Sequence, residues 1–216
     1  MHIPDGFLDV KTWVTASTLS IGALGYSVKK TRQQLSDRQI PQLGVMAAFI
    51  FAAQMINFPI AGGTSGHLLG AALATTLLGP WSASIVLATV LIIQCFVFLD
   101  GGITALGANI FNMAVLGVII AWAFNVAIKG IIKGNLGLGL ASFAAAWFSV
   151  MGAALMTTLE LAVSGTVPFN VALPAMLGVH AIIGVGEGLI TAVVVLTVLN
   201  MGYQPAWFKK EDICCD

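Results

Sequence analysis

The chain has 216 residues, of which 58% are hydrophobic and 8% are charged, and its formal net charge at pH 7 is zero. A soluble domain carries roughly 25% charged residues, so this composition excludes a water-soluble protein. It indicates one integral membrane domain over residues 1–216, in contact with the lipid bilayer and with no basic surface for a nucleic acid.

Seven mostly apolar segments are candidates to enter a bilayer, which a spanning helix crosses with about 20 residues. They are residues 11–28, 41–58, 66–79, 81–99, 105–128, 137–163 and 176–201. The third is short and follows a glycine-rich stretch, so we expect it to enter only part way or behind other helices. The fourth follows Gly79-Pro80, a dipeptide that ends one helix and begins another. The predicted fold is an all-α polytopic bundle of about seven helices.

Basic residues predict the orientation of this bundle, because cytoplasmic loops carry an excess of Lys and Arg. With seven helices, only Lys11 falls on the side of the N-terminus. The N-terminus and the linkers 59–65, 100–104 and 164–175 are therefore expected outside, with the C-terminus in the cytoplasm of a prokaryotic cell. The other basic residues are Lys29, Lys30, Arg32, Arg38, Lys129, Lys133, Lys209 and Lys210.

The first two residues form a possible metal chelate on the outer face. An α-amine has a pKa of about 8, so it loses its proton near neutrality. The amine of Met1, the amide nitrogen of His2 and Nδ1 of the His2 ring close two adjacent chelate rings and place three nitrogens in one plane. His67 would supply the fourth. Planar nitrogen donors favour Ni(II) or Cu(II), because zinc prefers a tetrahedron and magnesium prefers oxygen.

Less specific interpretations apply to the same histidines. A histidine at the end of a chain is often incidental, and His67 alone is compatible with a hydrogen-bonded residue at a helix start. Thr64 or Ser65 is suited to cap a helix that begins there. The dipole of such a helix would oppose a cation.

Four motifs run along nearly the whole chain: MHIPDGF at 1–7, SGHLLGAALATTLLGP at 65–80, ALGANIFNMA at 105–114 and MLGVHAIIGVGEGLIT at 176–191. On these motifs the chain resembles the NikM/CbiM family, the substrate-binding membrane subunits of energy-coupling-factor importers for nickel and cobalt. The resemblance implies that Met1, His2 and His67 bind the ion. It implies Ni2+ or Co2+ as the substrate, with nickel favoured by the planar nitrogens, and no cofactor.

The resemblance also implies partner proteins: a membrane scaffold subunit, separate ATP-hydrolysing subunits and, as an optional addition, a small accessory membrane subunit. No G-x-x-x-x-G-K-[ST] phosphate loop occurs in the sequence, so ATP hydrolysis by that route must come from a partner. Ala48 and Ala52 are small residues four positions apart on a helix, a spacing that allows close helix contact. They are candidates to contact the scaffold subunit or another helix of the same chain.

Further polar residues are candidates to support the metal ligands. A metal-bound imidazole usually donates its second N–H to an oxygen atom. Asp5 is also suited to hold the terminal segment or to form a turn before Gly6. His180, Glu187 and Glu160 are ionisable groups in apolar segments, which mark function or join helices by hydrogen bonds. The candidate acceptors are Asp5, Thr64, Ser65, Asn109 and Asn112.

Two rival functions remain open from the sequence. The stretch 63–66 matches the GxSG motif of rhomboid intramembrane proteases, with Ser65 as nucleophile and His180 as base. The long separation of these two residues and the lack of an arginine-bearing outer loop speak against it. A proton-coupled metal carrier that works alone would use Glu160, Glu187 and His180 as a proton relay.

Overall fold

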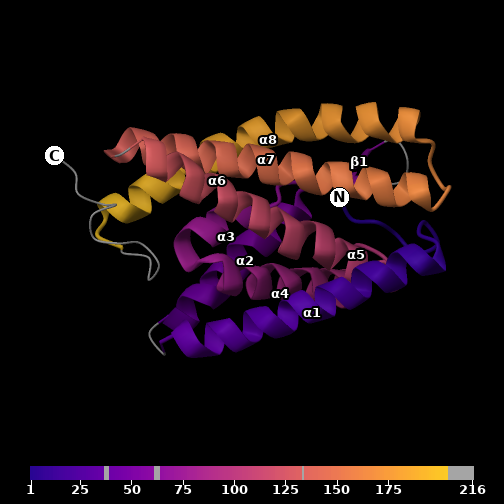
Figure 1. Ribbon diagram of the computed structural model, residues 1–216, viewed down its shortest axis with the longest axis horizontal. Helices are drawn as coiled ribbons and strands as arrows, with labels where there is room; N and C mark the ends of the chain where they lie inside the picture. Colours follow the sequence, from indigo (N-terminus) through magenta and orange to yellow (C-terminus); the bar gives the residue numbers. More distant parts are fainter. Residues whose placement is uncertain (37–38, 61–63, 133, 204–216) are drawn as a thin grey trace.

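A computed structural model describes residues 1–36, 39–60, 64–132 and 134–203, which form an elongated bundle of helices (Figure 1). The first helices are α1 (Val10–Gln34), α2 (Ile40–Met55), α3 (Ala71–Leu78) and α4 (Pro80–Phe98). One rod then combines α5 (Leu106–Ile110), the π-helix η2 (Phe111–Leu116) and α6 (Gly117–Ile131). The last two helices are α7 (Gly134–Val163) and α8 (Phe169–Asn200). Among the described residues, these rods confirm the predicted all-α bundle.

Four helices have the length and apolar character of membrane spans. They are α4, the rod over Leu106–Ile128, α7 and α8, while α2 is a shorter apolar helix. Large apolar side chains such as Phe96, Ile182 and Val193 are exposed on the outside of these helices. Such surfaces are stable against lipid but not against water. The chain is therefore a multi-pass integral membrane protein.

Several helix boundaries differ from the prediction. The first helix continues to Gln34 instead of residue 28, because polar helix formers extend it beyond its apolar part. The last begins at Phe169 instead of residue 176 and contains Pro174 inside it, where the missing N–H removes one backbone hydrogen bond of the helix. Of the predicted third segment, residues 66–79, only Ala71–Leu78 form a helix, which is α3. The basic residues Arg38, Lys133, Lys209 and Lys210 lie outside the described residues.

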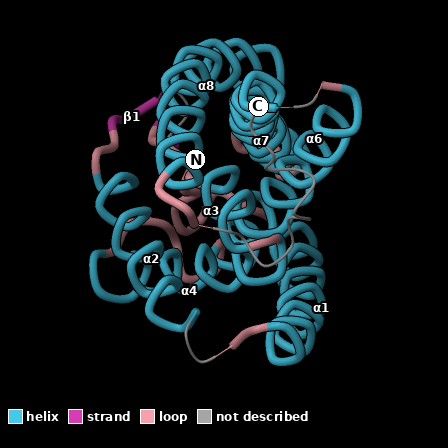
Figure 2. The backbone as a smooth tube through the Cα atoms, turned by 90° about the vertical axis from the view of Figure 1, so that its left-hand side faces the viewer, coloured by secondary structure: helices cyan, strands magenta, loops and turns pink. Residues whose placement is uncertain are grey.

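A short hairpin, which the sequence did not predict, precedes α3. Strand β1 (Phe58–Ile60) pairs antiparallel with β2 (Thr64–Gly66), and Pro59 lies opposite Ser65. Both strands lie beside α8 (Figure 2). The predicted helix cap at Thr64 or Ser65 is therefore wrong, because these residues are extended and α3 begins only at Ala71. Strands of three residues are too short to show an alternating pattern.

Helices α7 and α8 pack against each other along much of their length (Figure 1). Glycines on α8 permit this approach. A Cβ atom at Gly188 would lie 2.6 Å from Cδ2 of Phe143, and one at Gly184 would lie 3.0 Å from Cδ1 of Trp147. The Trp147 indole N–H also donates to the Ala181 carbonyl at 3.2 Å. Small residues thus let α8 approach the aromatic side chains of α7.

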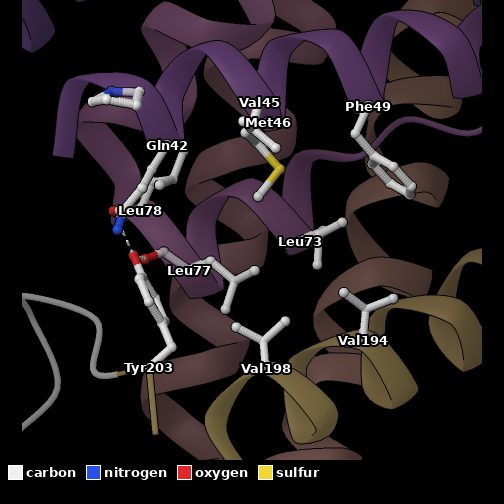
Figure 3. Close-up of a pocket in the computed structure, with 11 residues that line it drawn as sticks. Gln42, Val45, Met46, Phe49, Leu73, Leu77, Leu78, Val194, Val198 and Tyr203 are labelled. Carbon is white, nitrogen blue, oxygen red and sulfur yellow. Dashed lines mark hydrogen bonds between the residues drawn. The ribbon is translucent and has the colours of Figure 1, made fainter. Parts of the chain in front are cut away.

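An apolar groove of about 390 Å³ opens between α2, α3 and α8, near the C-terminal end of α8 (Figure 3). The Tyr203 hydroxyl closes one side, at 3.1 Å from both the Gln42 Oε1 and the Leu77 carbonyl oxygen. The residues along the groove include Val45, Phe49, Leu73, Val194 and Val198.

The substitution Gly188→Ala is expected to lower the thermal unfolding temperature of the detergent-solubilised protein. The added methyl group collides with Phe143, and overpacking of this kind costs about 1–3 kcal/mol. Gly186→Ala is the matched control, since a Cβ there meets nothing within 4 Å. It should keep or raise the unfolding temperature, because alanine is the better helix former. Equal temperatures for both variants would contradict the close contact of α7 with α8.

Candidate metal centre

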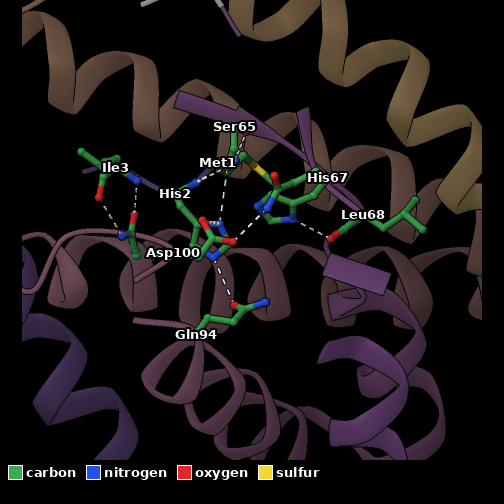
Figure 4. A network of polar contacts seen from close by, with 10 residues as sticks. Met1, His2, Ile3, Ser65, His67, Leu68, Gln94 and Asp100 are labelled. Atoms are coloured by element: carbon green, nitrogen blue, oxygen red, sulfur yellow. Dashed lines mark hydrogen bonds and ion pairs between the residues drawn. The ribbon is translucent and has the colours of Figure 1, made fainter. Parts of the chain in front are cut away.

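Residues 1–5 form an N-terminal strap that folds back among the helices (Figure 1), and Figure 4 shows Met1, His2 and Ile3 of this strap from close by. Met1 and Ile3 are 0% exposed, and His2 is 4% exposed. The Ile3 N–H donates to Asn109 Oδ1 at 2.9 Å, and the Ile3 carbonyl accepts from Asn109 Nδ2 at 3.1 Å. The Gly102 N–H donates to the same carbonyl at 2.9 Å. Because both polar groups of this backbone unit are paired, the strap is stable in a buried position.

Asp5 ties the end of the strap to the turn after α4. Its carboxylate accepts from the Ile103 N–H at 3.1 Å, and from the Thr104 N–H and hydroxyl at 2.7 and 2.6 Å. These hydrogen bonds, led by the Thr104 hydroxyl, lower the pKa of Asp5. A Cβ at Gly102 would lie 2.6 Å from the Pro4 carbonyl carbon, so the strap lies directly against this turn.

Strand β2 meets the strap from the other side. The Met1 amine donates to the Ser65 carbonyl and lies 3.2 Å from the Ser65 hydroxyl oxygen. The His2 amide nitrogen is also 3.2 Å from that oxygen. Two residues further along, the His67 ring stacks on the His2 ring, with centroids 4.6 Å apart and an interplanar angle of 25°. The hairpin therefore brings Met1, His2 and His67 together.

Hydrogen bonds select the tautomer of both rings. The His2 Nε2–H donates to Gln94 Oε1 at 3.2 Å, and the His67 Nδ1–H donates to the Leu68 carbonyl at 2.8 Å. Metal-binding imidazoles make bonds of this kind with the nitrogen that does not bind metal. Nδ1 of His2 and Nε2 of His67 keep their lone pairs. Within the described part of the chain, the buried Nε2 of His67 has no hydrogen-bond partner, a cost that a bound cation would remove.

Burial makes these nitrogen groups neutral. Desolvation lowers the pKa of the Met1 amine from 8.0 to about 4, although the nearby Asp100 opposes the shift. Desolvation, followed by the neighbouring amine, lowers the pKa of His2 from 6.5 to about 3. The same two causes lower the pKa of His67 well below 6.5. At neutral pH all three groups therefore present lone pairs, without positive charges that would repel a cation.

The candidate set of metal donors is unusual because part of it belongs to the backbone. No group of three or more His, Cys, Asp or Glu side chains with metal-binding geometry occurs among the described residues. The amine of Met1, the amide nitrogen of His2 and two imidazole nitrogens are nevertheless gathered at one place. A set made of nitrogens alone favours Ni(II) or Cu(II) over Mg²⁺ or Ca²⁺.

Glu187 of α8 fixes the backbone that follows His67. Its carboxylate accepts from the Leu69 N–H at 2.5 Å and from the Gly70 N–H at 2.8 Å. These residues directly precede α3, and a carboxylate is stabilising at the N-terminus of a helix. Glu187 thus supports the loop that carries His67 without contacting the ring itself.

The remaining polar candidates lie around the centre. The Thr64 hydroxyl donates to Met176 Sδ at 2.9 Å, and the His180 Nδ1–H donates to the Met176 carbonyl at 2.7 Å. The Asn112 side chain in η2 donates to Glu160 at 2.6 Å. Asn109 binds the strap backbone, and none of these side chains accepts an N–H from the two stacked rings.

The expected acceptors for the imidazole N–H groups therefore need correction. Of the predicted set, only Ser65 approaches either ring in the described structure, with its oxygen 3.4 Å from His2 Nδ1. The acceptors are Gln94 and the Leu68 carbonyl. Gln94 lies within a continuous apolar segment and a backbone carbonyl leaves no sequence signal, so neither was recognised. Asp100, with Oδ1 at 3.3 Å from His2 Nδ1, was also missed.

The protease hypothesis lacks its central contact. The Ser65 hydroxyl oxygen lies beside Met1 and His2, and the described residues contain no hydrogen bond between Ser65 and His180. Gly63 of the proposed motif lies outside the described residues. The described arrangement therefore provides no contact between Ser65 and His180, the base that the protease hypothesis requires.

Comparison with known proteins agrees with a transport role. Residues 2–205 match the family described as CbiM, cobalt uptake substrate-specific transmembrane region. The chain is 45% identical over 197 residues to a putative fused nickel transport protein NikMN of Archaeoglobus fulgidus. This alignment covers 90% of the present chain and 64% of that protein. The chain is also 36% identical over 221 residues to a putative metal transport protein of Methanocaldococcus jannaschii. This alignment covers 98% of the present chain and 96% of that protein. These relatives are named as transport proteins and not as enzymes.

Two solved structures that resemble this chain are also described as transporters, of transition metals. A crystal structure of a truncated transition metal transporter matches with a TM-score of 0.84 and 33% identity, over 94% of this chain and 100% of that one. A second crystal structure, of a transition metal transporter, matches equally well over 95% of its chain.

Replacing Asn109 with Ala is expected to expose the Met1 amine to a small amine-reactive reagent. The variant loses two hydrogen bonds to Ile3, and a loss of one or two kcal/mol increases the open fraction roughly 5–30-fold. Labelling of Met1 by mass spectrometry measures this change. Asn125→Ala is the matched control, because Asn125 is also buried but donates to Thr76. Equal labelling of both variants would contradict the role of Asn109 in holding the strap.

Proposed function

The chain belongs to the CbiM family, and from this premise we propose that it is the substrate-binding subunit of an ATP-driven importer of the energy-coupling-factor type. In this role it captures a divalent transition-metal ion with high affinity, nickel in preference to cobalt. The end of the bundle that carries the strap would face the outside of the cell. The ion is the transported substrate and needs no further cofactor.

One observation carries this proposal. The buried ring of His67 stacks on the ring of His2, and its Nε2 has no hydrogen-bond partner among the described residues. Nδ1 of His2 likewise carries a lone pair and no hydrogen. Together with the Met1 amine and the His2 amide nitrogen, these atoms supply the four donors of the expected chelate. The two rings are already in metal-binding tautomers, so little reorganisation is needed on binding.

Loss of the His2 amide proton supports the preference for nickel. A peptide N–H is a very weak acid, and nickel and copper displace its proton more readily than cobalt or zinc do. The Ser65 hydroxyl next to this nitrogen is able to reverse its hydrogen bond and donate once the proton has left. The charge of the dication is then reduced by one, which lowers the cost of burying it.

Transport requires partners that this chain does not supply. The 216 residues contain no phosphate loop, so ATP-hydrolysing subunits and a membrane scaffold subunit are part of the proposal, with a small accessory membrane subunit as an optional component. Ala48 and Ala52 are exposed on α2 and remain the proposed scaffold contact. The apolar groove beside them offers a second surface for a partner helix (Figure 3).

A carrier that works alone is the second candidate function. It would need Glu160, Glu187 and His180 as a connected relay, yet each binds a different partner and no hydrogen bond joins them within the described residues. Nickel uptake by vesicles that contain only this chain, abolished by an uncoupler, would favour the carrier. Uptake that depends on ATP and the partner subunits favours the importer.

Adding one residue before Met1 is expected to weaken nickel binding by about 100-fold or more, because loss of a metal ligand removes several kcal/mol of binding energy. The extension moves the amine away from His2 and leaves the helices unchanged. Isothermal titration of the purified protein measures the effect, and intact mass first verifies that Met1 begins the reference chain. His67→Ala should show a similar loss. The matched control His180→Ala should bind nickel normally. Undiminished binding by the extended protein would refute the terminal chelate.

Nickel affinity is expected to rise about tenfold per pH unit between about pH 6 and pH 8. The lowered pKa values of the Met1 amine and both histidines leave these groups neutral over this range, so nickel displaces no proton from them. The amide proton of His2 is the one released, and higher pH therefore favours binding. Titrations in buffers of different ionisation enthalpy count the protons. A flat pH profile would show that the amide keeps its proton.

A further inference from the structure

Asp100 is an acidic residue that a tight turn directs toward the metal centre. Leu99, at the end of α4, adopts a left-handed conformation with φ of 56°, and the Asp100 N–H donates to the Gln94 carbonyl at 3.0 Å. A left-handed backbone conformation is unfavourable for leucine, so the surrounding contacts hold this turn in place. The Asp100 side chain is 18% exposed and lies between the buried rings and the solvent.

The carboxylate has one neighbour in the centre and one outside it. Oδ2 accepts from Asn57 Nδ2 at 2.9 Å, which fixes the orientation of the group. Oδ1 lies 3.3 Å from His2 Nδ1 (Figure 4). Because the His2 Nε2–H is donated to Gln94, Nδ1 carries a lone pair, and two lone pairs face each other across this contact. Such an arrangement favours a cation beside both atoms.

The charges of the proposed site provide a second argument. A dication bound to a deprotonated amide, a neutral amine and two neutral imidazoles carries a net charge of one. A buried charge without a partner is costly, and a carboxylate in contact with the chelate removes this cost. Asp5 is fully engaged with Ile103 and Thr104, and Glu187 with Leu69 and Gly70. Among the described residues, Asp100 is the carboxylate with a recorded contact to a chelating atom, at 3.3 Å from His2 Nδ1.

We propose that the Asp100 carboxylate is the counter-charge of the captured ion. It attracts the hydrated dication to the solvent-facing side of the centre, and it balances the positive charge of the ion once the chelate has closed. This inference rests on the proposed function. Association is then steered by a charge close to the solvent, whereas the nitrogens determine which metal is retained. Steering of this kind raises association rates roughly tenfold or more and weakens as salt is added.

The test compares Asp100→Asn with the unaltered protein, using stopped-flow nickel binding at low and high salt and equilibrium titration. The asparagine keeps the size of the side chain and an oxygen for Asn57. We expect at least roughly tenfold slower association at low salt and little remaining salt dependence. Asp100→Glu, which keeps the charge, should retain the salt dependence. Unchanged kinetics in Asp100→Asn, or equal loss in both variants, would overturn the proposal.

Asp9→Asn is the matched control for a general loss of negative charge. Asp9 caps α1 near the same end of the bundle, and asparagine is an equally good cap. Its nickel binding should be unchanged, and an effect equal to that of Asp100→Asn would also overturn the proposal. If Asp100→Asn does not fold, Asp100→Ser gives the same comparison. If the unaltered protein binds no nickel, the proposed function itself fails, an outcome distinct from any effect of Asp100.

Discussion

The pairing of the Ile3 backbone with Asn109 and Gly102 is the interaction on which the centre depends. A chain terminus is polar and charged in water, and an apolar bundle does not admit it unless its backbone groups are satisfied. The amide side chain of Asn109 offers both an acceptor and a donor to one residue, and Gly102 has no side chain to keep the strap away. Met1 and His2 are buried as a consequence.

Burial then determines the chemistry of the nitrogens. The same desolvation that makes an ammonium or imidazolium costly lowers the pKa of the Met1 amine and of His2, and leaves neutral donors. A site made of neutral nitrogen ligands binds a dication only if its positive charge is balanced. The deprotonated amide of His2 and the carboxylate of Asp100 would both supply negative charge. Gln94 connects the two, since its side chain accepts from the His2 ring and its carbonyl accepts from the Asp100 N–H.

The two halves of the centre are supported by different parts of the fold. The strap depends on α5 and the turn after α4, whereas the His67 loop depends on β1, β2 and Glu187 of α8. In the proposed function, an ion held between the two halves would join these parts, and its release would require them to separate. A movement of α8 relative to α4 and α5 would act on both halves at once.

The sequence by itself determined the membrane class, the all-α fold and most helix positions, because apolar segments of sufficient length have few alternatives in a bilayer. It also singled out Met1, His2 and His67 through the order of donor atoms at the chain start and the family motifs. Only the tertiary structure decided that Thr64 and Ser65 lie in a strand, that Gln94 and the Leu68 carbonyl orient the rings, and that Asp100 faces His2. These contacts join residues far apart in the chain or involve backbone atoms, so no local pattern encodes them, and strands of three residues are too short to be read from periodicity.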